Sequence, residues 1–159
     1  MPVVSRGDKF VFAQVIKDVV DFLDLEDDTS PALSPEALAR RYGGILETAI
    51  RLTRQMPNNH LEDQLPNRPR SWLVLMHHVF QIPIAFLDME EKKETLTYET
   101  MVASPPENMK TVADIAAFDE AVRRRFQAWW KEAEGTDFSG DVSTYFGATS
   151  RHEMLERTV

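Results

Sequence analysis

The sequence predicts an all-α fold, a bundle of four to five helices in up-down order whose last helix is short or incomplete. Three observations predict it. Apolar residues recur at the spacing of amphipathic helices along most of the chain. Serine, threonine, proline and glycine stand where such helices would begin and end. An alternating strand pattern is almost absent, and a bundle is the architecture that buries helical faces of this kind.

The composition is that of one globular domain. The 159 residues are 43% apolar and 28% charged, enough to bury a sizeable core. We expect a single domain over residues 1–159, with an N-terminal helix and linker at 1–33 and the bundle at 34–159. The net charge of −8 argues against nucleic acid as a partner, since phosphate binding needs a basic face.

The chain contains no cysteine, which excludes thiol nucleophiles, cysteine zinc sites and disulfides. Its first residues lack the apolar core of a secretory signal, and no run approaches the roughly 18 continuous apolar residues of a membrane span. We therefore expect a cytoplasmic protein with no membrane partner.

The first helix is predicted at Phe10–Leu25, where apolar residues follow the helical spacing. It ends in an acidic linker, Glu26–Pro35, with the composition of an exposed loop. Lys9–Leu25 also looks like the closing helix that follows a glutaredoxin-like domain in some fused bacterial proteins. This second resemblance implies a longer parent protein with a redox domain ahead of this segment.

The next helix begins after Ser34 as N-cap, has Pro35 at its first position, and runs to about Gln55. Gly43 and Gly44 lie in its middle, where each glycine destabilises the helix by about 1 kcal/mol relative to alanine. We expect them to permit the close approach of another helix.

Arg70–Glu90 is the most apolar helical segment and carries two adjacent histidines, His77 and His78. A helix that is apolar nearly all round is buried on most sides. A buried imidazole is costly unless its nitrogens find partners, so one ring is expected to form hydrogen bonds in the core or to bind a metal ion. The spacing does not say which ring points inward. Pro83 removes a backbone hydrogen bond here and should kink the helix.

A long helix is predicted at Val112–Glu134, the cleanest periodic pattern in the chain. Thr111 and Asp114 cap its start, and Gly135 is a natural stop. Trp130 lies off the apolar stripe and is expected to rim a cleft or an interface.

The remaining segments are predicted to be loops, except for one last helix. Thr136–Ala148 is glycine-containing and irregular. Ser150 and Glu153 form a capping-box pattern that opens a helix at Arg151–Val159. Nine residues make a marginal helix and no stop signal follows, so we expect a fragment of a longer chain.

Three segments together resemble the DinB/YfiT-like superfamily: the run LMHHVFQIPIAFLD, the following long helix with its tryptophans, and the late helix that opens SRHEMLERTV. Members are four-helix bundles, often dimeric, and many hold a divalent metal with three histidines. The resemblance implies that His78 is the metal ligand from the second bundle helix, with His77 as the fallback. It places the other two ligands in a His-x-x-x-His pair on the last helix, and the sequence ends at Val159 before that pair.

The resemblance implies a metal-dependent thiol transferase or hydrolase scaffold in a homodimer, with the site incomplete in this sequence. Three histidines hold zinc or nickel with an open position for water or a small thiol substrate, whose pKa the metal lowers. Arg68 and Arg70 are interpreted either as solvated loop charges or as a clamp for an anionic substrate, beside a pocket shaped by Trp129 and Trp130.

The alternative function is a non-catalytic helical module that dimerises or docks through an apolar face. An incomplete last helix favours it, because a bundle that lacks most of one helix exposes apolar surface. A carboxylate-bridged metal bundle would need glutamate three residues before histidine on facing helices, and no histidine in the chain has one.

Overall fold

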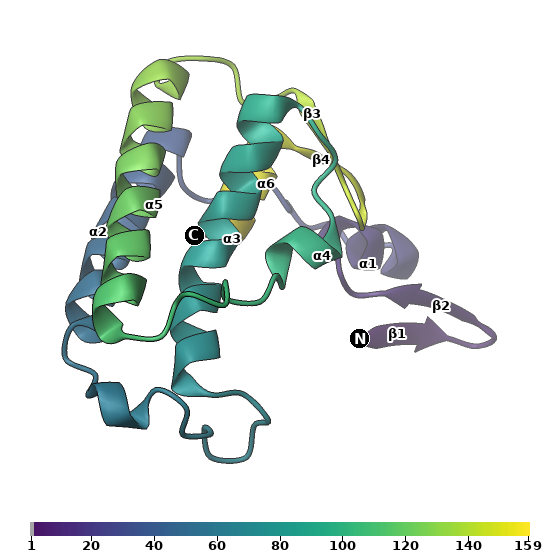
Figure 1. Cartoon of the computed structure of the whole chain (residues 1–159). Helices are drawn as coiled ribbons and strands as arrows, with labels where there is room; N and C mark the ends of the chain where they lie inside the picture. The colour runs from purple at the N-terminus through teal and green to yellow at the C-terminus, as the bar shows by residue number, and fades with distance from the viewer. Residues whose placement is uncertain (1) are drawn as a thin grey trace.

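The computed structural model describes residues 2–159 as a predominantly helical domain with two small antiparallel β-hairpins (Figure 1). The expectation of an all-α four-helix bundle is therefore wrong. In chain order the elements are β1 Val3–Arg6, β2 Lys9–Phe12, α1 Ile16–Leu23, α2 Pro35–Thr53, the 3₁₀ turn η1 Asn58–His60, α3 Trp72–Lys92, α4 Tyr98–Met101, α5 Val112–Ala133, β3 Asp141–Thr144, β4 Gly147–Ser150 and α6 Arg151–Thr158.

The predicted helix at Phe10–Leu25 is in fact part of a hairpin followed by the shorter helix α1. Strand β2 pairs with β1 in the register Val4↔Val11, and Figure 1 shows this hairpin projecting from the helices. Gly7, at a φ of +64°, closes the turn in a conformation that only glycine adopts freely. A four-residue strand shows too little alternation to be told from part of a helical stripe, which explains the error.

The segment after α5 forms the second hairpin instead of an irregular loop. Strands β3 and β4 pair in the register Val142↔Thr149. The loop after α3 is attached to this hairpin: Leu96 N donates to Ser143 O at 3.0 Å, and Tyr145 N donates to Leu96 O at 2.8 Å. These hydrogen bonds join residues far apart in the sequence, and no local pattern predicts them.

The helix caps agree with the sequence signals. The Ser34 side chain accepts the Ala37 amide at 3.3 Å at the start of α2. Capping boxes open α5, at Thr111 and Asp114, and α6, at Ser150 and Glu153. Gly135 follows α5 with a φ of +75°, as expected of a glycine stop.

Helix α5 packs against both α2 and α3, and α6 covers part of the opposite side between the same two helices (Figure 1). The core lies between them. Its fully buried or nearly fully buried members include Leu46, Phe80, Phe86, Leu87, Val122, Phe126 and Leu155. The expected close approach at Gly43 and Gly44 is absent, because a Cβ atom at either position would meet no atom within 4 Å.

Helix α3 is the one helix in residues 2–159 that is long and apolar enough to cross a membrane by length and composition. Its apolar surface is used within the molecule, where it contacts α5 and α6. The central helix of a small soluble domain has the same length and composition.

A buried ion pair attaches α6 to the long helices. The Glu90 side chain is 1% exposed and its Oε2 lies 2.7 Å from Arg151 Nη2. Trp129 Nε1 donates to the same oxygen at 3.3 Å. Arg151 also donates to Thr136 Oγ1 at 2.9 Å, and its guanidinium lies 4.1 Å from the centre of the Phe138 ring. Because every charged group here has several partners, the pair holds α3, α5 and α6 in one arrangement.

Candidate functional site

His77 lies in the core with one ring nitrogen free. Its side chain is 3% exposed and stacks on Phe118, with ring centroids 5.1 Å apart and planes 19° apart. Among residues 2–159 its Nδ1 atom has no hydrogen-bond partner. Burial, and in second place the neighbouring His78, lower its pKa, so the ring is neutral at neutral pH. The inference that one histidine is buried is therefore supported, and the buried one is His77.

His78 is half-buried on the adjacent face of α3. Burial lowers its pKa, the Arg70 guanidinium lowers it further, and interaction with the backbone of Met101 opposes both. Helix α4, which contains Met101, packs on this side of α3, where Gln81 Nε2 donates to Thr100 O at 2.7 Å. His78 is thus a neutral imidazole at neutral pH that faces a short helix.

The other histidines lie elsewhere and have partners of their own. His60 Nδ1 lies 2.6 Å from Asp63 Oδ2, and His152 Nε2 lies 2.8 Å from Leu33 O. Within residues 2–159, no group of three or more His, Cys, Asp or Glu side chains is arranged to hold a metal ion.

Of the aromatic and basic residues that the sequence suggested for a pocket, only some lie near the histidines. Arg70 lies close enough to His78 to affect its pKa, whereas Arg68 is an exposed loop residue. Trp129 is a core residue. It lies eleven positions beyond Phe118 on α5, so roughly 16 Å of helix separates it from the ring that stacks on His77.

An apolar groove lies between α2 and α3 and is here termed the α2–α3 groove. It has a volume of about 180 Å³. Its lining consists of Ala49, Leu52, Thr53, Trp72, Leu75, Met76, Val79 and Phe80. Leu52 on α2 and Val79 on α3 are 59% and 37% exposed, so both helices contribute exposed apolar surface to the groove.

The groove does not include His78. The α3 residues that line it recur at three- and four-residue steps, and His78 is not among them: it is rotated by about 100° around the helix from Val79. The histidine site and the α2–α3 groove are therefore separate features of α3. Leu52 stands on the apolar stripe of α2, three residues after Ala49 and six after the buried Leu46, yet it is exposed. Periodicity identifies an apolar face but not whether another element covers it.

A buried carboxyl group lies behind the groove, and the sequence pattern did not single it out. Asp119 is 0% exposed, and its Oδ2 accepts a hydrogen bond from Thr53 Oγ1 at 3.0 Å. Its Oδ1 has no partner among residues 2–159. Burial raises the pKa of Asp119 to about 7, because few groups replace the lost water. A signal existed: Asp119 stands on the apolar stripe of α5, four residues after Ile115 and three before Val122.

A comparison of the chain with protein-family models, with curated proteins and with solved structures finds no match. The resemblance to the DinB/YfiT-like superfamily stays a prediction.

Proposed function

We propose that this chain is a helical interaction module that self-associates through the α2–α3 groove. The observation that carries the proposal is the apolar lining of the groove, with Leu52 and Val79 exposed across it. Removing apolar surface from water contributes about 25 cal/mol per Å². A protein partner would remove the exposed side chains of the groove from water, and this supports the proposal.

A second copy of the chain is the partner that best fits the pattern on α2. Ile45, Ala49 and Leu52 follow one another at steps of four and three residues, the spacing of a seam between two packed helices. Ile45 and Leu52 are 38% and 59% exposed, and the small Ala49 between them lets another helix approach. In a two-fold dimer the same surface of each copy would be used, so one apolar seam suffices.

The test is the molar mass in solution, measured by light scattering after size-exclusion chromatography over a range of concentrations. The parent chain is expected to be dimeric, and Leu52→Glu monomeric, because the variant places a charge in the seam. Leu25→Glu is the matched control: Leu25 is 53% exposed but lies in the linker after α1, so the variant should stay dimeric. A parent chain that is monomeric throughout, or a Leu52→Glu variant as dimeric as the parent, contradicts the proposal. Circular dichroism confirms that each variant is folded.

The second candidate is the metal-dependent thiol transferase or hydrolase that the resemblance implies, acting with zinc or nickel on a small thiol or another small molecule. The supporting observation is a pair of adjacent imidazoles with lowered pKa values, of which His77 keeps Nδ1 without a partner in residues 2–159. Neutral imidazole is the form that binds metals. For both candidates we propose a cytoplasmic location, which the acidic, cysteine-free composition supports.

Elemental analysis of tag-free protein distinguishes the two candidates. Near-stoichiometric zinc or nickel that disappears in His78→Ala supports the metal-dependent enzyme. His60→Ala is the control, since His60 pairs with Asp63 away from α3, and its metal content should match that of the parent. Protein that contains no metal in any of the three forms excludes His78 as a resident metal ligand and leaves the interaction module.

A further inference from the structure

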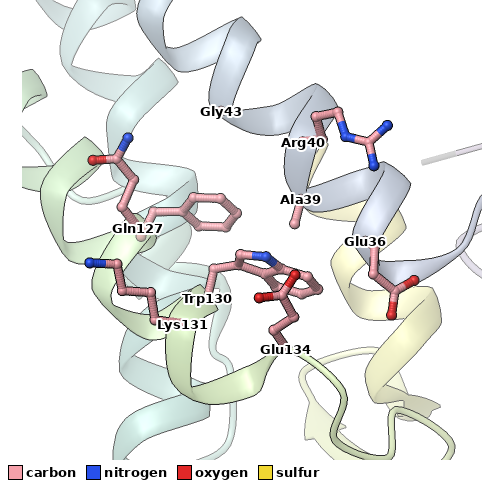
Figure 2. A pocket seen from close by; sticks show the side chains of 9 residues that line it. Glu36, Ala39, Arg40, Gly43, Gln127, Trp130, Lys131 and Glu134 are labelled. Carbon is pink, nitrogen blue, oxygen red and sulfur yellow. The ribbon is translucent and has the colours of Figure 1, made fainter.

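A second and larger cleft lies on another side of α2, between its first half and the last turns of α5. It is termed here the α2–α5 cleft and has a volume of about 610 Å³. Its lining consists of Glu36, Ala39, Arg40, Gly43, Phe126, Gln127, Trp130, Lys131 and Glu134. Figure 2 shows the Trp130 indole between the two helices, with Glu36 and Glu134 at one end and Gln127 at the other. The volume falls within the range of roughly 300–1,000 Å³ typical of small-molecule sites.

Packing against neighbouring residues does not explain why position 43 is a glycine. A glycine inside a helix destabilises it by about 1 kcal/mol relative to alanine. No neighbour excludes a side chain at this position, because a Cβ atom would meet nothing within 4 Å. Gly43 does line the α2–α5 cleft, where a missing side chain leaves backbone surface open to a flat group. The next residue, Gly44, is equally free of neighbours but is not part of the lining.

The charged residues of the cleft are available to a ligand. Glu36, Arg40, Lys131 and Glu134 include two acids and two bases, and none of them forms an ion pair with another residue in the range 2–159. Elsewhere on α5, Arg125 pairs with Asp88 at 2.6 Å and with Glu91 at 2.7 Å. A hydrogen bond from Ser34 is the main cause of a lowered pKa at Glu36, which therefore stays ionised at neutral pH.

We propose that the α2–α5 cleft binds a small zwitterionic aromatic molecule of the kind represented by a free aromatic amino acid. The ring of the ligand lies on the Trp130 indole and against the backbone at Gly43, where flat apolar surfaces meet. Its ammonium group interacts with the carboxylates of Glu36 and Glu134 and with the indole face. Its carboxylate group interacts with the Lys131 ammonium on the α5 side of the cleft, near Gln127.

The proposal does not depend on self-association. The α2–α5 cleft and the α2–α3 groove share no lining residue, since the first uses residues 36–43 of α2 and the second residues 49–53. A ligand in the cleft and a second copy on the groove would therefore contact different faces of α2, and either proposal can fail alone.

The test is isothermal titration calorimetry with L-tryptophan as the probe, followed by two analogues that each lack one charged group. Tryptamine lacks the carboxylate and indole-3-propionate lacks the ammonium group. Each analogue is expected to bind about tenfold more weakly, the usual effect of losing one charge-assisted contact. Failure of both L-tryptophan and L-phenylalanine to bind would overturn the proposal. Analogues that bind as well as L-tryptophan would overturn the roles proposed for the charged side chains of the cleft.

The matched variants are Gly43→Ala and Gly44→Ala. Both should raise the melting temperature, because alanine stabilises the interior of a helix. Only Gly43→Ala is expected to weaken L-tryptophan binding, by at least about fivefold, since its methyl group would stand where the ring lies. Trp130→Leu keeps an apolar side chain and should weaken binding by about tenfold. Equal affinities for Gly43→Ala and Gly44→Ala would show that the ligand does not lie in this cleft.

Discussion

At the scale of single residues, the least usual feature is a carboxyl group buried between α2 and α5. Asp119 is fully buried, receives one hydrogen bond, from Thr53, and has a pKa raised to about 7. The nearby Glu120 carboxylate also raises this pKa, so no positive charge offsets the burial. Such a group favours its protonated form in the folded protein and thereby makes stability depend on pH.

Asp119→Asn is expected to flatten the pH dependence of folding stability. In the parent, the unfolded chain releases the proton near the ordinary aspartate pKa of 3.8, whereas the folded protein holds it to a pKa of about 7. The folded state therefore binds more protons between these values, and stability falls as the pH rises from about 4 to about 7, by ~1.4 kcal/mol per unit of pKa difference. Above that range it levels off.

Urea unfolding of both proteins at pH 5 and pH 8 measures this effect. Thr53→Val is the matched variant, because it removes the hydrogen bond but keeps the carboxyl group. Since that hydrogen bond lowers the Asp119 pKa, this variant should show a pH dependence at least as large as that of the parent. If Asp119→Asn shows the same difference in stability between the two pH values as the parent, Asp119 is not the group responsible.

At the scale of elements, the helices follow their local signals, whereas the contacts that join them do not. The caps of α2, α5 and α6 use residues within three positions of each other. The attachment of α6 rests on Glu90 and Arg151, which lie 61 positions apart. A short helix contributes little stability by itself, so α6 depends on this contact and on its buried apolar residues.

Arg151→Met is expected to destabilise the fold by roughly 3–5 kcal/mol, because it leaves the Glu90 carboxylate buried without its counter-charge. The double variant Glu90→Leu with Arg151→Met should recover much of that loss, since no unpaired charge remains. Arg125→Met is the control: its ion pairs are about one-third exposed, so it should cost no more than about 1 kcal/mol. Chemical denaturation measures all three, and equal losses for Arg151→Met and Arg125→Met would argue against a special role of the buried pair.

At the scale of the whole molecule, two of the openings between the helices lie on different sides of α2. One is the apolar α2–α3 groove and the other is the charged α2–α5 cleft with its indole. We propose the first as a protein interface and the second as a small-molecule site.

The self-association that we propose through the groove would have a thermodynamic consequence for the whole molecule. A dimer is stabilised by mass action, so its melting temperature should rise with protein concentration. The same series with Leu52→Glu should give one melting temperature at all concentrations. This measurement checks the light-scattering result by an independent route. A parent chain whose melting temperature does not change with concentration would contradict the proposed dimer.

Sequence by itself determined where α2, α5 and α6 begin, whereas the short helix α4 lies in a segment predicted to be a loop. Ser34, Thr111 and Ser150 cap the helices predicted from them, because a cap and its partner lie within one turn. The buried histidine was also foreseeable, since an apolar helix must bury whatever polar residue it carries on its inner side.

Tertiary structure decided the rest. It placed both hairpins, whose strands of four residues are too short to show a period, and it selected His77 over His78 as the buried ring. It also buried Asp119 and left Leu52 exposed, although both stand on apolar stripes. Periodicity shows which side chains share a face of one helix. Whether that face is buried depends on a neighbouring helix, and contacts between residues far apart in the chain decide which helix that is.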